Sequence, residues 1–157
     1  MINCNKNKLI QLATSFRTAI MESDPKVLII TLRNFPRGAC GDATLLLAKY
    51  LEENKCNHFE YICGKKEHQT HAWLERAGLI IDITADQLNN QNSPVIVSKD
   101  HTWHLQFEVE SRRIADFVAL YDQHTVSSLS KSYKAIIKTI NSRAEQNAQR
   151  RQGIAAV

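Results

Sequence analysis

The sequence predicts an α+β protein in which a central antiparallel sheet packs against a helix over residues 40–53. Two runs with the character of strands, 70–76 and 79–84, are separated only by Ala77-Gly78, which is typical of a β-hairpin. Apolar side chains also recur at helical spacing in 7–22, 40–53 and 130–147. The length of 157 residues fits one domain with one hydrophobic core.

The first part of the chain mixes helical and strand patterns. Residues 7–22 predict a helix, whereas the apolar, β-branched run Val27–Leu32 predicts a short buried strand with breakers on both sides. A helical continuation through 26–33 is the alternative. The helix over 40–53 has an apolar face and ends in charged residues.

The rest of the chain continues with strands and then helices. Residues 58–63 alternate like a half-buried strand and precede a turn at 64–69. Val95–Val97 predicts one more strand after a polar loop. Apolar residues at helical spacing predict a helix over 111–124, before the one over 130–147.

Composition indicates a soluble globular protein. Hydrophobic residues make up 43% and charged residues 23% of the chain. We expect residues 1–149 to form a single domain and residues 150–157 to fray. No apolar run approaches the ~20 residues of a membrane span, and the polar N-terminus lacks the apolar stretch of a signal peptide. We therefore expect a cytoplasmic protein without a membrane partner, although a chain exported without a signal peptide, or a fragment, has the same features.

The net charge of +4 comes largely from basic residues near the C-terminus. Contact with nucleic acid is one interpretation. We favour the solvated face of a helix, because no aromatic residues interleave with the basic ones as a stacking site requires. The oligomeric state is left open.

Four cysteines, Cys4, Cys40, Cys56 and Cys63, are present. A cytosolic chain of this length does not need disulfides, so we predict four thiols, one of them reactive.

Cys40 is the predicted nucleophile. It is expected in the first turn of a helix, where free N–H groups and partial positive charge favour a thiolate. Small neighbours such as Gly41 let a substrate backbone approach the sulfur. Burial as a small apolar side chain is the alternative.

His71 and Asp82 are the predicted base and its orienting acid. If Ala77-Gly78 forms a two-residue loop, His71, Trp73 and Asp82 lie on one face of the hairpin, with Asp82 diagonal to His71. Asp82 also interrupts an apolar strand, and a buried carboxylate there needs a partner. A three-residue loop puts the pair on opposite faces.

Two further residues are assigned to the site. Trp73 is predicted to cover the imidazole–carboxylate pair, with a plain core role as the alternative. An oxyanion hole is predicted from the backbone N–H of Cys40 and the side chain of Asn34. An ordinary turn residue is the alternative for Asn34.

Zinc binding is a rival interpretation, because cysteines and histidines gather in 56–71. Their spacing matches neither a Cys-x-x-Cys knuckle nor a His-Glu-x-x-His helix, so we predict no metal and no cofactor. His101 and His104 flank Trp103 and can line a pocket rim, but no motif around them indicates a particular function.

The ordered motifs Gly-Ala-Cys-Gly-Asp-Ala, His-Ala-Trp-Leu-Glu and Asp-Ile-Thr resemble the transglutaminase-like core of the papain-like cysteine protease fold, over roughly residues 34 to 88. The resemblance implies a papain-like fold, with Cys40 as nucleophile, His71 as base and Asp82 as orienting acid. The chain shows no acidic calcium loop, which argues against calcium-dependent cross-linking.

The predicted function is thiol-dependent attack on an amide of a protein or peptide substrate, through a covalent thioester on a Cys-His-Asp triad. Hydrolysis makes the protein a cysteine peptidase, amidase or deamidase. Amine transfer, as in an acyltransferase or transglutaminase, and a non-catalytic binding or scaffold protein are the alternatives.

Overall fold

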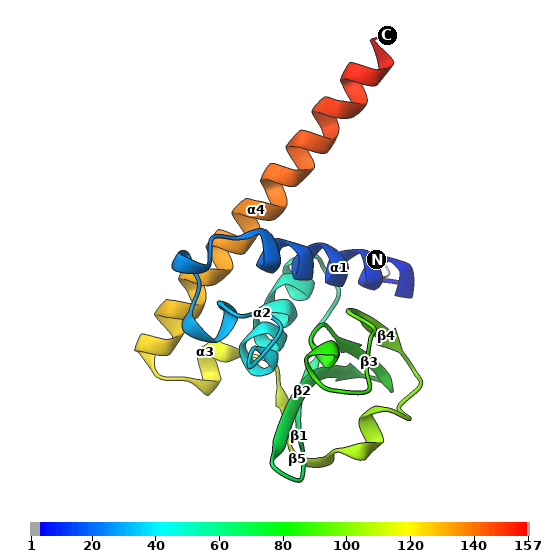
Figure 1. Ribbon diagram of the computed structural model, residues 1–157, viewed down its shortest axis with the longest axis vertical. Helices are drawn as coiled ribbons and strands as arrows, with labels where there is room; N and C mark the ends of the chain where they lie inside the picture. The colour runs from blue at the N-terminus through cyan, green and yellow to red at the C-terminus, as the bar shows by residue number, and fades with distance from the viewer. Residues whose placement is uncertain (1–3, 157) are drawn as a thin grey trace.

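A computed structural model describes residues 4–156 and has an α+β architecture, with a five-stranded antiparallel sheet and helices (Figure 1). The strand order is β4-β3-β2-β1-β5. The strands are β1 (Glu60–Lys66), β2 (Gln69–Arg76), β3 (Leu79–Asp82), β4 (Ile96–Ser98) and β5 (Glu108–Ile114). The helices are α1 (Lys6–Glu22), α2 (Cys40–Glu53), α3 (Phe117–Leu120) and α4 (Gln123–Ala155), with short 3₁₀ turns η1 (Pro25–Val27), η2 (Ile30–Leu32), η3 (Ala85–Gln87) and η4 (His104–Gln106).

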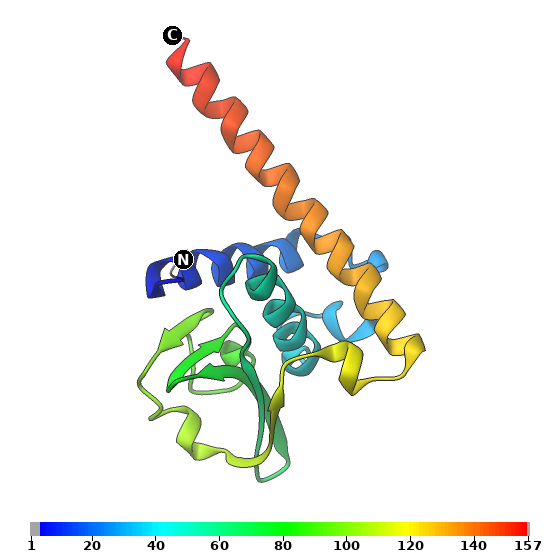
Figure 2. The same ribbon diagram turned by 180° about the vertical axis from the view of Figure 1, so that it is seen from behind.

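Helix α2 lies at the centre of the molecule, between the sheet and helices α1 and α4 (Figures 1 and 2). Its apolar face and those of α1 and α4 form the main core together with Leu74 and Ile81 from the sheet and Ile83 just after β3. A second, smaller core lies around Trp73 and Phe107 and is closed by the segment that carries η4. The predicted packing of an antiparallel sheet against the 40–53 helix is confirmed.

The register of the β2–β3 hairpin is the predicted one. Arg76 pairs with Leu79, so Ala77 and Gly78 form a two-residue loop. Both loop residues have positive φ, 47° for Ala77 and 74° for Gly78, as a type I′ hairpin turn requires. This loop places Asp82 and the odd-numbered positions of β2 on one face.

The prediction of a strand at Val27–Leu32 is wrong, and so is a regular helix there. The segment forms η1 and η2, with Leu28 and Leu32 buried while Val27 and Ile30 face solvent. Within residues 4–156 this segment pairs with no strand, and the Ile29 N–H instead donates to the Ser132 hydroxyl of α4 at 2.8 Å.

Two other predictions from periodicity need correction. The helix predicted over 111–124 is replaced by β5, the single turn of α3 and the start of α4. The strand predicted at 58–63 is β1, which begins at Glu60 and runs on into the predicted turn as far as Lys66.

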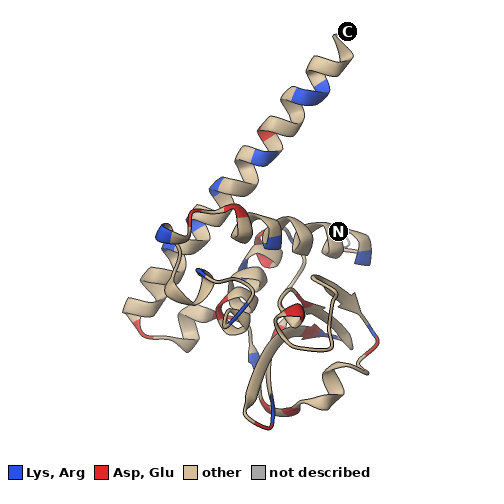
Figure 3. Ribbon diagram, viewed as in Figure 1, with Lys and Arg blue, Asp and Glu red and all other residues tan. Residues whose placement is uncertain are grey.

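Helix α4 is longer than predicted. It continues through Ala155 instead of ending near Gln149, and its last part projects away from the rest of the protein (Figure 1). Basic residues are spread along it, as Figure 3 shows. The predicted frayed tail is therefore helical in its described part, and residue 157 lies outside the described residues, as do residues 1–3.

The prediction of four thiols is wrong. Cys4 and Cys56 form a disulfide, with their Cα atoms 5.0 Å apart, and leave Cys40 and Cys63 as the free cysteines. The bond joins the segment before α1 to the segment after α2, which lie side by side in the fold. Over residues 4–156, no helix combines the length and the apolar character that crossing a membrane requires.

Candidate functional site

Cys40 is the first residue of α2. Ala39 precedes it as the N-cap and makes no side-chain hydrogen bond to the helix. The first N–H groups of a helix have no partner within it, so this end of α2 favours an anion at the sulfur. Cys40 is half-buried. Beside it, a Cβ on Gly41 would lie 3.2 Å from the Tyr61 hydroxyl, so any side chain there crowds this tyrosine.

His71 and Asp82 form a buried hydrogen bond, with Nε2 of His71 2.7 Å from Oδ2 of Asp82. Both side chains are essentially inaccessible to solvent. The His71 side chain also interacts with the Cys40 thiol. The structure thus brings together the three residues that the sequence singled out.

The three groups shift one another's protonation. Burial raises the pKa of the Cys40 thiol, but the hydrogen bond and charge of His71, helped by Gln87 and the Ala72 backbone, bring the pKa below its ordinary value. Burial lowers the pKa of His71, but the charge and hydrogen bond of Asp82, with Cys40, raise it to about 9. Burial raises the pKa of Asp82, yet its two histidine partners hold it far below its ordinary range. These directions favour a thiolate–imidazolium pair beside an ionised carboxylate.

Gln87 joins this site although no pattern in the sequence around it indicates a functional role. Its Oε1 accepts a hydrogen bond from the Gly38 N–H at 3.0 Å, which leaves Nε2 facing the His71 imidazole. Nε2 lies 3.2 Å from Nδ1 of His71, and the Gln87 side chain helps to lower the pKa of the Cys40 thiol. The only sequence signal is that Gln87 follows Asp82 closely, in the turn η3.

The turn that carries Gln87 is anchored from α1. The Arg17 guanidinium is buried and binds both carboxylate oxygens of Asp86, at 2.9 and 2.8 Å, and the carbonyls of Ile83 and Pro94. Bidentate pairing fixes a carboxylate in orientation as well as position. Arg17 therefore fixes the backbone of the turn in which Gln87 lies.

The other predicted site residues have different outcomes. Asn34 is exposed in the turn before α2, and its carbonyl accepts from the Arg37 N–H. The side-chain amide that helps to lower the pKa of the Cys40 thiol is that of Gln87. Trp73 is buried and stacks near-parallel on His71, with ring centroids 5.9 Å apart.

Gly64 makes room for that aromatic layer. It lies directly opposite His71 on β1. A Cβ at this position would come within 2.8 Å of the Phe107 Cβ and 3.2 Å of the Trp73 ring. Only glycine leaves both rings in place behind the imidazole.

His104 is the second residue that sequence reasoning missed. Its Nε2 lies 2.8 Å from the same Asp82 oxygen that His71 contacts. His104 is buried and belongs to η4, 22 residues after Asp82 in sequence. The only hint in the sequence is its place beside Trp103, which indicated a pocket rim and no particular partner.

The zinc site considered at 56–71 does not form. Cys56 is in the disulfide, and the exposed His58 lies 3.4 Å from Glu52. Within residues 4–156, the metal-type donors that do cluster are His71, Asp82 and His104. Their N···O separations of 2.7 and 2.8 Å are those of charge-assisted hydrogen bonds. Ligands about 2.1 Å from a shared ion lie farther from each other, so this geometry favours hydrogen bonding over metal binding.

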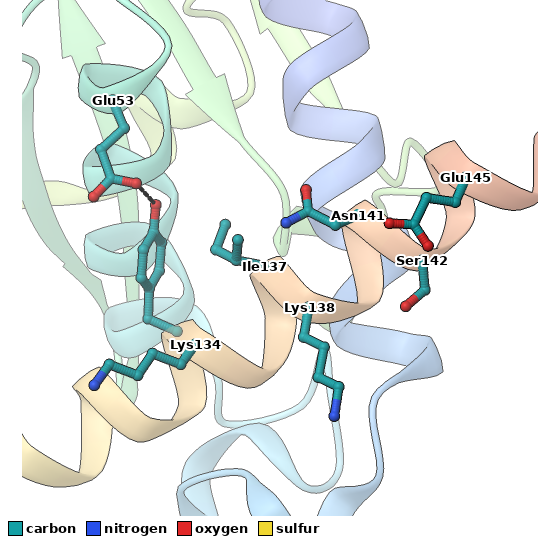
Figure 4. A pocket seen from close by; sticks show the side chains of 8 residues that line it. Glu53, Lys134, Ile137, Lys138, Asn141, Ser142 and Glu145 are labelled. Atoms are coloured by element: carbon teal, nitrogen blue, oxygen red, sulfur yellow. Dashed lines mark hydrogen bonds between the residues drawn. The ribbon is translucent and has the colours of Figure 1, made fainter. Parts of the chain in front are cut away.

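A surface cavity of about 500 Å³ lies elsewhere, between the C-terminal end of α2 and α4 (Figure 4). Glu53, Tyr133 and Lys138 are among its lining residues, and the Tyr133 hydroxyl donates to Glu53. Cys40 is at the opposite end of α2. The cavity therefore does not belong to the Cys40 site.

Comparisons of this chain with protein-family models, with curated proteins and with solved structures found no match. The transglutaminase-like resemblance stays a prediction that rests on its three sequence motifs.

Proposed function

We propose that this protein is a thiol-dependent amide hydrolase of the papain-like, transglutaminase-like type. The observation that carries the proposal is the His71 imidazole, which binds ionised Asp82 through Nε2 at 2.7 Å and interacts with Cys40. A base positioned between a nucleophile and an orienting acid is the arrangement that covalent acyl transfer needs.

In the proposed reaction, the Cys40 thiolate attacks the carbonyl carbon of an amide and forms a tetrahedral oxyanion. The imidazolium of His71 gives its proton to the leaving amine, the C–N bond breaks, and a thioester remains. A water molecule then gives a proton to His71 as it attacks the thioester. The C–S bond breaks, the carboxylic acid leaves, and the Cys40 thiolate is released beside the His71 imidazolium, which restores the resting pair. Asp82 stays ionised and holds the imidazole.

Gln87 replaces Asn34 as the proposed oxyanion donor, together with the backbone N–H of Cys40. The Gly38 contact fixes the amide oxygen, and the N–H₂ group then lies 3.2 Å from Nδ1 of His71, on the side where the Cys40 thiol also feels it. We expect Gln87→Ala to slow acylation by roughly 10²-fold, since removing one oxyanion donor costs about that much. Gln87→Glu, which keeps the size but loses the donor, tests the same role.

Acylation can be tested without knowing the natural substrate. The protein is incubated with an activated ester such as p-nitrophenyl acetate, and its intact mass and modified peptide are measured. The proposal predicts acetylation of Cys40, which hydroxylamine removes, and no acetylation in Cys40→Ala or His71→Ala. Acetylation confined to Cys63 or to lysines contradicts it. Circular dichroism must show that the variants are folded.

Hydrolysis and amine transfer are separated with the same acyl-enzyme. In water enriched in ¹⁸O, hydrolysis places the label in the released acid. A fluorescent primary amine instead becomes attached to the acyl group if the protein is an acyltransferase. We propose hydrolysis as the main route and a protein or peptide as the substrate.

A non-catalytic binding or scaffold protein is the alternative, and the complete burial of His71 is the observation that favours it. A closed site binds no substrate, so an unreactive Cys40 in folded protein supports this alternative. The cytoplasmic location also stays a proposal. The Cys4–Cys56 bond is more typical of an oxidising compartment, and counting thiols in freshly isolated protein tests which state occurs.

A further inference from the structure

A second histidine reaches the carboxylate that holds His71. Nε2 of His104 and Nε2 of His71 lie 2.8 and 2.7 Å from the same oxygen, Oδ2 of Asp82. The other oxygen, Oδ1, accepts the Thr84 N–H at 2.9 Å. Two separate segments of the chain and the backbone just after Asp82 therefore donate to one carboxylate, which fixes both its position and its plane.

These contacts determine where the protons lie. To donate to an ionised carboxylate, both imidazoles must carry a proton on Nε2. Nδ1 of His104 is buried and has no hydrogen-bond partner among the described residues. A proton on that nitrogen would leave a buried N–H unpaired at a substantial free-energy cost. His104 is thus held as an Nε2–H donor.

The ring of His104 is also held in place by its neighbours. The centroid of Trp73 lies 4.9 Å away and that of Trp103 lies 4.8 Å away, the latter in an edge-to-face arrangement. Trp103 is itself tied to the loop after η3 by a 3.1 Å hydrogen bond to Asn90. The donor therefore reaches Asp82 in a single orientation.

We propose that His104 is a positioning residue, which fixes Asp82 for His71 by donating to the same acceptor oxygen. This inference rests on the proposed function of the Cys40 site. An N–H donor on Oδ2 disperses part of the carboxylate charge, so less of that charge acts on His71. The titratable groups that face the cluster are Cys40 from α2, His71 from β2 and Asp82 from β3.

The inference is tested by substitutions at position 104 with ¹⁵N-histidine labelling and a pH titration of His71 by NMR. His104→Phe removes the donor but keeps a ring, and we expect the His71 midpoint to rise by about one pH unit. His104→Gln retains an N–H donor and should restore most of the wild-type midpoint. His101→Phe is the matched control, because His101 lies in the same segment but binds the Gly78 carbonyl at 2.8 Å.

An unchanged His71 midpoint in folded His104→Phe overturns the inference. A His104 proton on Nδ1 in the wild-type protein also overturns it. This tautomer is read from the ¹⁵N spectrum of the wild type, so it decides the question even if the phenylalanine variant does not fold. Neither result depends on turnover. If Cys40 is unreactive but His104 carries its proton on Nε2, the enzyme proposal fails. The hydrogen bond from His104 to Asp82 is then still supported.

Discussion

The two free cysteines, Cys40 and Cys63, lie in regions that shift their thiols in opposite directions. Cys40 begins a helix and contacts a charged imidazole, and its pKa is lowered although burial acts against it. Cys63 lies in the middle of β1, where burial and then the charge of Cys40 raise its pKa. Both are half-buried. The partners of a thiol, more than its exposure, therefore decide the direction in which its pKa shifts.

The largest expected effect comes from removing the charge behind His71. We expect Asp82→Asn to abolish the difference between the two cysteines, because the imidazole loses the partner that favours its protonated form. Stability should also fall, by about 3–5 kcal/mol, since the buried charge network is broken. Urea unfolding and alkylation rates measure the two effects. Undiminished preference for Cys40 in the folded variant would show that Asp82 has no role in activating it.

Removing the buried charge of Arg17 is a control for Asp82→Asn, because Arg17 lies outside the Cys40 site. Arg17→Met removes the clamp on Asp86 and leaves acceptors unpaired, so we expect a stability loss of about 2–3 kcal/mol. Arg17 does not touch Cys40, His71 or Asp82, so the pH profile of Cys40 alkylation should stay within a few tenths of a unit. A displacement as large as that of Asp82→Asn would mean that the η3 turn controls the thiol.

The pH dependence of the free energy of unfolding should report on the His71–Asp82 pair. The pKa of His71 is about 9 in the folded protein against an ordinary 6.5. The stability that its protonation contributes is therefore fully present below pH 6.5 and lost as the pH rises toward 9. The pKa of Asp82 is depressed in the folded protein. The stability that its ionised carboxylate contributes is therefore present above about pH 3.8 and is lost as the pH falls.

We therefore expect wild-type protein to lose roughly 2–3 kcal/mol between pH 6 and pH 9 in urea unfolding. His71→Phe serves as the control and should lack most of this slope. Equal slopes in the two proteins would indicate that His71 is not protonated in the folded state.

The smallest expected effect concerns Trp73. Its indole N–H is buried without a hydrogen-bond partner among the described residues, so Trp73→Phe loses no hydrogen bond. We expect a stability loss of about 1–2 kcal/mol from packing. If the ring shields the His71–Asp82 pair, the alkylation profile of Cys40 moves by a few tenths of a pH unit. An unmoved profile assigns Trp73 a purely structural role.

The parts of the site that were predictable share one property: they follow from local geometry. The register of a two-residue hairpin fixes the face of Asp82, and a polar residue in an apolar strand demands a partner. The helix at Cys40 has a clear periodicity. The amino-acid sequence alone is therefore enough to predict that His71 and Asp82 lie together.

The remaining features depend on segments that meet only in the fold. His104 reaches Asp82 from a 3₁₀ turn, which has no periodic sequence pattern. The position of Gln87 depends on the ion pair between Arg17 and Asp86 that holds its turn. The apolar spacing of Ile114, Phe117 and Tyr121 fits a helix as well as a strand followed by a turn, and β1 supplied the strand partner. The Cys4–Cys56 pair likewise needs the start of α1 and the end of α2 to lie side by side.

The most direct test of the central claim is competitive alkylation of Cys40 and Cys63 in one sample. Folded protein is treated with iodoacetamide at pH 6, and peptide mass spectrometry gives the rate at each residue. The account predicts labelling of Cys40 at least roughly tenfold faster than Cys63, because an ordinary thiol with a pKa near ~8.5 is mostly protonated at this pH. The preference should disappear in His71→Ala. Equal or slower labelling of Cys40 in the wild type would contradict the claim that Cys40 is an activated nucleophile.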